Sequence, residues 1–240
     1  MLYMCLGLGH AIADNNWKDL PAIEKAREAG VSDYAINRLF GSGHAQQLER
    51  SEILEFLTFL VSVKKRGFDV NPFLNKLDEG FVKKVPIKRI KAVLQRKLEN
   101  CQFIESLSGK SDARHISYYS HSIAILSDTL DLGLTRNDLR DLFAYRPGTP
   151  LNMMAVAAEN KALLRQIHFP VEQTDKIIQS GLEHETFSFD WRKLFMIIAH
   201  AKQRGISDEV ITNAVICQLQ GNGDIRAILS ELGFIERRLK

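Results

Sequence analysis

Apolar residues along the chain recur with the spacing expected of helices. Ile87, Ile90, Val93, Leu94 and Leu98 lie at intervals that place them on one side of a helix. No stretch alternates apolar and polar residues with a period of two over the length of a strand. The pattern therefore predicts an all-α fold.

The apolar runs predict long and short helices in alternation. The long helices are expected near residues 17–29, 47–66, 115–132, 151–167 and 187–204. The short ones are expected near residues 32–40, 69–79, 135–144, 170–180 and 207–219. A further helix is expected over residues 86–104, and a terminal helix is expected to be capped by Asp224.

One short motif separates many of these helices: a glycine, an apolar residue, and then a serine, aspartate or threonine. Its glycines are Gly30, Gly67, Gly133 and Gly205. Residues 84–86 and 168–170 are copies that lack the glycine and end in proline. Glycine can end a helix in the left-handed conformation, the polar residue can cap the next helix, and proline suits the first helical turn. We therefore expect these glycines to matter for stability rather than for activity.

The motif repeats with nearly constant spacing. Its copies lie 35–37 residues apart, except for a longer interval in the middle of the chain. A helical hairpin of that length is typical of repeats that stack into an α-solenoid. We expect two helical-repeat halves, residues 14–105 and 115–240, joined by the polar linker 106–114.

A dense motif begins within the end of the predicted helix 69–79. The stretch "NKLDEGFVKKVP", residues 75–86, combines a helix end, a glycine break at Gly80 and a helix that starts with proline. It resembles a K-x-x-E-G-x-x-K-x-V-P signature of uncharacterised, apparently exported bacterial helical-repeat proteins. The matching residues are Lys76, Glu79, Gly80, Lys83, Val85 and Pro86. The resemblance implies a helical-repeat fold and export, and it implies no activity.

Composition indicates a globular and only mildly basic chain. Of its 240 residues, 45% are apolar and 25% are charged, and the formal net charge is +3. This small charge argues against a surface that follows a nucleic-acid backbone along its whole length, so any such contact must be local.

The first thirteen residues have features of a signal peptide. Residues 1–13 are mostly apolar and end in Ala11-Ile12-Ala13, the pattern of small residues after which signal peptidases cleave. A positively charged start is missing, because the first basic residue is Lys18. We interpret residues 1–13 as a truncated signal peptide, which predicts a periplasmic or otherwise exported protein. The alternative is an ordinary N-terminal helix of a cytoplasmic protein.

The sequence offers few residues for cofactor or metal chemistry. Cys5, Cys101 and Cys217 form no metal-ligand spacing, and phosphate-binding, dinucleotide-binding and nucleophile-elbow motifs are absent. We therefore expect no cofactor and no metal. If the N-terminus is removed, Cys101 and Cys217 remain for one disulfide, which their geometry must decide.

The main polar feature is a basic helix. Residues 83–97 contain seven lysines or arginines. Apolar side chains gather on one side of this helix, and the other side carries Lys84, Lys88, Arg89 and Arg96. This cationic strip is a candidate contact for nucleic acid, anionic lipid or another polyanion. The alternative is an ordinary solvated face, which the lack of aromatic residues in the strip favours.

Two segments combine histidine with other polar residues. His115 and His121 are six residues apart and point to different faces of a helix, so they cannot chelate one metal as an i, i+4 pair does. His184 and Glu185 lie in a polar stretch that could perform acid–base chemistry. No nucleophile or second ligand accompanies them at a defined spacing, so ordinary packing is the favoured interpretation of both segments.

As a whole, the sequence favours a non-enzymatic interaction scaffold. Stacked hairpins present a continuous surface that can bind a protein or peptide, and the basic helix is the expected polar contribution. One alternative is a nucleic-acid-binding protein that uses residues 83–97. Another is an enzyme with a site near His184 and Glu185. The partner, the face that binds it and the oligomeric state do not follow from the sequence.

Overall fold

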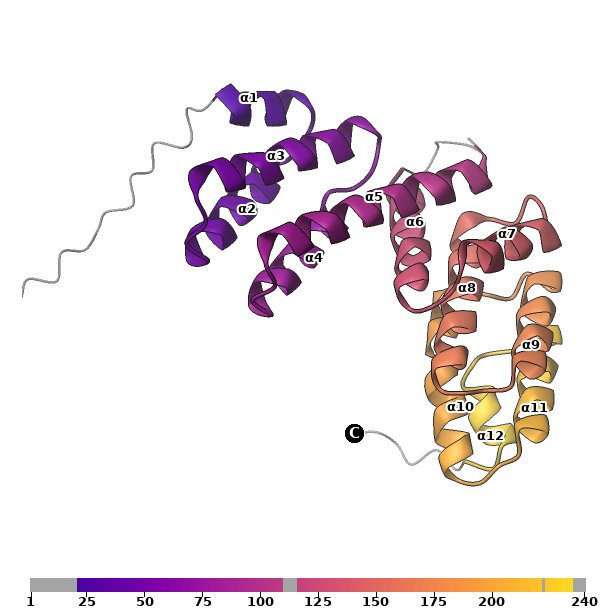
Figure 1. Cartoon of the computed structure of the whole chain (residues 1–240). Helices are drawn as coiled ribbons and strands as arrows, with labels where there is room; N and C mark the ends of the chain where they lie inside the picture. The colour runs from indigo at the N-terminus through magenta and orange to yellow at the C-terminus, as the bar shows by residue number, and fades with distance from the viewer. Residues whose placement is uncertain (1–20, 110–115, 222, 235–240) are drawn as a thin grey trace, which may run out of the picture. The chain divides into compact units, whose positions relative to one another are not determined.

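A computed structural model describes residues 21–109, 116–221 and 223–234 as helices joined by short connections (Figure 1). No strand occurs in these ranges, which confirms the all-α class. None of the helices in them is long and apolar enough to cross a membrane. The predicted signal peptide, residues 1–13, lies outside the described residues.

The chain divides into two compact units, residues 1–90 and 91–240. Unit 1 contains α1 (Pro21–Glu28), α2 (Asp33–Ala45), α3 (Arg50–Lys65), α4 (Asn71–Val82) and the first residues of α5 (Ile87–Ser108). Unit 2 contains the rest of α5, then α6 (Ile116–Asp131), α7 (Arg136–Tyr145), α8 (Leu151–Gln166), α9 (Val171–Glu183), the 3-10 helix η2 (Phe189–Lys193), α10 (Leu194–Gln203), α11 (Asp208–Gln220) and α12 (Ala227–Glu231).

The structure places several element boundaries differently from the sequence pattern. The division into units falls inside α5, whereas the linker was expected at residues 106–114; that segment is helical as far as Ser108, and its residues 110–114 lie outside the described chain. The helix expected over 187–204 begins as the 3-10 helix η2. Asp224 does not cap α12 directly, because α12 begins at Ala227 and the Asp224 carboxylate accepts from the backbone N–H of Arg226.

Many helices end in the same left-handed turn. In each case one residue has a positive φ and donates its N–H to the carbonyl three residues back, and the next N–H donates to the carbonyl five residues back. These two bonds satisfy carbonyls that the end of a helix leaves without partners. In the described chain, the left-handed residues that make both bonds of this turn are Gly30, Gln47, Gly67, Lys84, Gly133, His168, Glu185, Gly205 and Gly233.

Two of these turns belong to the copies of the sequence motif that lack the glycine. Each has a residue other than glycine at the left-handed position. The four glycines of the motif have φ between 76° and 106°, and Lys84 and His168 adopt φ of 52° and 55°. A left-handed residue with a Cβ costs roughly 1–2 kcal/mol. The two backbone hydrogen bonds and the packing of the following apolar residue therefore impose the turn even without glycine.

Gly80 differs from the expected turn, because it lies inside α4. A Cβ on Gly80 would stand 2.9 Å from the Cδ1 atom of Ile90, in the next helix. Gly43 in α2 has the same relation to Ile53 in α3, with a distance of 2.8 Å to Cδ1. The missing side chains let the end of one helix approach the start of the next.

Polar residues of the motif begin the short helices. The hydroxyls of Ser32 and Ser207 each accept from the backbone N–H three residues later, at 3.2 and 3.4 Å. Asp69 departs from this arrangement, because the N-cap of α4 is Val70 and the Asp69 carboxylate accepts from the backbone N–H of Asn71. Side-chain oxygens thus supply acceptors for helix starts that have free N–H groups.

Each unit has its own apolar core. In unit 1, α3 packs against α1 and α2, and α2 packs against α4. In unit 2, α8 is central: it contacts α6, α7, α9, η2 and α10, and its apolar side chains are largely buried. Figure 1 shows α9 and α11 following one another along one side of unit 2.

Candidate functional site

The turn between α4 and α5 carries three of the basic residues that the sequence singled out. Lys84 is the left-handed residue of this turn, and Lys88 and Arg89 lie in the first turn of α5. All three are exposed, and none forms an ion pair with another residue that the structure describes. We call Lys84, Lys88 and Arg89 the basic patch.

Backbone geometry and close helix packing hold the basic patch in place. The N–H groups of Lys84 and Val85 make the two hydrogen bonds of the turn, both 2.9 Å long. Ile90 is 3% exposed and occupies the space that Gly80 leaves, which fixes the start of α5 against the end of α4. The backbone under the patch is therefore set by local folding rather than by a bound partner.

The carboxylate near the end of α4 is already engaged by other lysines. Glu79 accepts from Lys83 Nζ at 2.6 Å and from Lys76 Nζ at 3.0 Å. These bonds, with Lys83 contributing most, lower the pKa of Glu79 to about 2. Glu79 is thus ionised at neutral pH, and its charge is matched by two lysines outside the basic patch.

An exposed apolar side chain adjoins the basic patch. Val82, the last residue of α4, is 80% exposed, which is the highest value among the large apolar side chains of the described chain. A single exposed valine is ordinary on a surface, but this one lies two residues before Lys84 in the chain. Sequence reasoning missed Val82, because apolar residues of an amphipathic helix are expected in the core.

The last predicted residue of the cationic strip, Arg96, and its neighbour Lys97 in the basic run 83–97 differ in burial. Arg96 is exposed on the part of α5 that belongs to unit 2. Lys97 is 4% exposed, and its Nζ lies 2.5 Å from Asp128 Oδ1 on α6. Lys97 therefore belongs to the contact between α5 and α6 and is not part of a binding surface.

The two cysteines of the described chain are free thiols. Cys101 is buried in α5, and burial raises the pKa of its thiol to about 11. Cys217 is exposed on α11. The disulfide that the sequence left open is not formed between them.

His184 and Glu185 take part in local structure at the end of α9. His184 is exposed, and its Nδ1 lies 2.9 Å from the carbonyl oxygen of Ser180 in the same helix. Glu185 is a left-handed turn residue, and its carboxylate accepts from Arg146 Nη2 at 2.6 Å. The structure thus gives both side chains neighbours that orient the helix end.

The other histidine segment is only partly described. His115 lies outside the described residues, and His121 is exposed on α6 with its ring centroid 5.7 Å from that of Phe189. Within the described ranges, no three histidine, cysteine, aspartate or glutamate side chains are grouped as a metal site requires.

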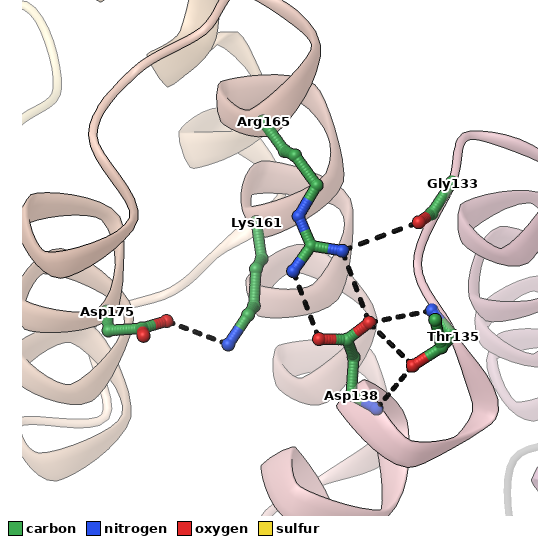
Figure 2. Close-up of polar contacts among 6 residues, drawn as sticks. All are labelled: Gly133, Thr135, Asp138, Lys161, Arg165 and Asp175. Carbon is green, nitrogen blue, oxygen red and sulfur yellow. Dashed lines mark hydrogen bonds and ion pairs between the residues drawn. The ribbon is translucent and has the colours of Figure 1, made fainter.

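A charged cluster joins α7, α8 and α9 in unit 2 (Figure 2). Arg165 donates to both carboxylate oxygens of Asp138, at 3.2 and 3.0 Å. Asp138 also accepts from the backbone N–H and the hydroxyl of Thr135, both at 2.7 Å, and Lys161 Nζ lies 2.7 Å from Asp175. Arg165, together with Thr135, holds the pKa of Asp138 well below its usual range. Because its charges are paired with one another, we assign this cluster to stability.

No family model matches the chain, and neither a curated protein nor a solved structure matches it. Function must therefore be inferred from the basic patch and its surroundings.

Proposed function

We propose that the protein is a non-enzymatic interaction scaffold of helical repeats, which binds a protein or peptide partner through the basic patch. The observation that carries this proposal is the exposure of Lys84, Lys88 and Arg89 without an ion pair to another described residue, next to the exposed Val82. Protein interfaces combine an apolar centre with a polar rim, and an apolar side chain beside cations suits such a contact.

The recurring turn supports the repeat part of the proposal. The stretch "AREAGVSDYAI" at residues 26–36 returns as "AKQRGISDEVI" at residues 201–211. In the first stretch Arg27 pairs with Asp33 at 2.8 Å, and in the second Lys202 pairs with Asp208 at 2.9 Å. The same ion pair across the same turn, near both ends of the described chain, is what a duplicated hairpin would give.

Nucleic acid is the less suitable partner for the basic patch. Proteins that bind duplex DNA commonly make roughly 6–10 phosphate contacts. The patch offers three cations and contains no aromatic side chain on which a base could stack. A protein segment that carries a few carboxylates needs only a few cations.

A charge reversal tests the proposal in native cells. We expect that carbodiimide, which joins a lysine amine to a carboxylate in contact with it, links the tagged full-length chain to a partner protein. The variant Lys84→Glu, Lys88→Glu, Arg89→Glu should lose this product, because it removes the amines and repels the partner.

A matched variant controls for charge alone. Lys64, Lys65 and Arg66, at the end of α3, are also exposed and make no ion pair within the described chain, so their reversal to glutamate changes the charge of unit 1 equally. This variant should keep the cross-linked product. Loss in both variants, or retention in both, would contradict the proposal, as would a patch that binds a DNA duplex and no protein.

We also infer export to the periplasm or cell envelope. The support is the apolar stretch 1–13 and its end at Ala11-Ile12-Ala13. Fractionation of native cells followed by N-terminal sequencing should find a chain that starts at Asp14 in the envelope or periplasmic fraction. A chain that retains Met1 in the cytosol would contradict export.

A further inference from the structure

Two arginines of α7 lie over one aromatic ring of α5 within unit 2. The Cζ atoms of Arg136 and Arg140 lie 5.0 and 5.1 Å from the centroid of the Phe103 ring. Neutral amides hold both guanidinium groups: Arg136 donates to Asn100 Oδ1 at 3.3 Å, and Arg140 donates to Asn137 Oδ1 at 2.6 Å. The ring and the amides orient the two cations without neutralising them.

Other arginines of unit 2 have carboxylate partners. Arg146 pairs with Glu185, Arg165 with Asp138, and Arg192 with Glu159. Arg136 and Arg140 are exposed and form no ion pair with a residue that the structure describes. Their positive charge therefore remains available to a partner.

A third arginine extends the same face. Arg96 lies four residues before Asn100 and seven before Phe103 on α5, so the three share one side of that helix. Arg96 is exposed and likewise has no ion pair in the described ranges. We call Arg96, Phe103, Arg136 and Arg140 the arginine surface.

We propose that the arginine surface binds an acidic peptide segment of a partner protein through bidentate contacts between guanidinium groups and carboxylates. This inference rests on the proposed role as an interaction scaffold, but it uses a different surface from the basic patch. The planar guanidinium presents paired N–H donors that match the two oxygens of a carboxylate.

The two cations are close enough together to contact one extended peptide. Since each Cζ atom lies about 5 Å from one ring centroid, the Cζ atoms of Arg136 and Arg140 are at most about 10 Å apart. Alternate side chains of an extended peptide lie roughly 6–7 Å apart on one face. A single nucleic-acid strand fits less well, because the guanidinium groups already cover the Phe103 ring on which a base would stack.

Fluorescence anisotropy with the purified full-length protein tests the inference. The probe is a fluorescein-labelled peptide of alternating glutamate and serine, and the matching peptide with glutamine in place of glutamate is the control ligand. We expect binding of the first peptide only. The variant Arg136→Gln, Arg140→Gln should raise the Kd at least tenfold, and Arg136→Lys, Arg140→Lys should raise it several-fold, because lysine keeps the charge and loses the paired donors.

Two control variants separate this surface from general charge and from the basic patch. Arg204 is exposed, lies 5.8 Å from the Phe234 ring centroid and has no described ion pair, so Arg204→Gln should leave the Kd within about twofold. The variant Lys84→Gln, Lys88→Gln, Arg89→Gln should do the same.

Several results would overturn the inference. The first is that the glutamate peptide does not bind. The second is that the Arg136→Lys, Arg140→Lys variant binds the peptide with an unchanged Kd. The third is that the protein binds a deoxythymidine ten-mer and not the peptide. If the basic-patch variant alone lost binding, the arginine surface would be excluded while the proposed function stood. If cross-linking in cells failed while the arginine variants lost peptide binding, the basic patch would be excluded instead.

Discussion

At the scale of single residues, the left-handed turns link backbone conformation directly to stability. Gly67 has a φ of 85°, and a Cβ added to it would meet nothing within 4 Å. Gly41 has the same open surroundings but lies inside α2. The two glycines of unit 1 thus differ in backbone conformation and not in packing.

Alanine at these two positions should change stability in opposite directions. Gly67→Ala should lower the free energy of unfolding by about 1 kcal/mol, because a Cβ is unfavourable in the left-handed region. Gly41→Ala should raise it by about 0.5–1 kcal/mol, because glycine is a poor helix former. Urea unfolding followed by circular dichroism measures both, and a change of the same sign in both variants would contradict the assignment of Gly67 to a turn.

At the scale of elements, the ion pair between Asp138 of α7 and Arg165 of α8 should make the stability of unit 2 sensitive to acid. Asp138 has a lowered pKa in the folded state, so its ionised form stabilises unit 2 at pH values above the ordinary pKa of aspartate, near 3.8. This contribution is lost progressively as the pH falls below that value. Asp138→Asn should therefore cost about 1–2 kcal/mol at pH 7, and the difference from the natural chain should shrink toward pH 2.5.

Urea unfolding at the two pH values checks this expectation. Glu172→Gln is the control, because Glu172 pairs with Lys176 on the exposed side of α9 and its loss should leave stability unchanged within error. An Asp138→Asn effect that stays constant with pH would show that the carboxylate charge does not contribute.

At the scale of the whole molecule, the proposed binding surfaces lie where exposed cations have no described ion pair. The chain has a small net charge of +3, and many of its charged side chains pair within their own unit, as Arg165 does with Asp138. Several exposed cations depart from that rule, among them the basic patch and Lys64, Lys65 and Arg66 in unit 1, and the arginine surface and Arg204 in unit 2. Total charge therefore says little about partners, and the local distribution of charge decides which surfaces are available.

The sequence by itself determined where most helices lie and many of the left-handed turns that end them. Helical periodicity and the conformational freedom of glycine act over a few residues, so they can be read without knowing distant contacts. Even the turns at Lys84 and His168 were recognisable, because an apolar residue and a proline follow each. The turns at Gln47 and Glu185 carry no such signal.

Only the tertiary structure decided which basic residues are exposed and which are buried in a contact between helices. Lys97 and Arg96 are neighbours in the same basic run, yet Lys97 is buried against Asp128 while Arg96 is exposed. Arg136 and Arg140 reach Phe103 across more than thirty residues of sequence. Burial and pairing depend on contacts between elements far apart in the chain, and the periodicity of one helix contains no information about the neighbour against which it packs.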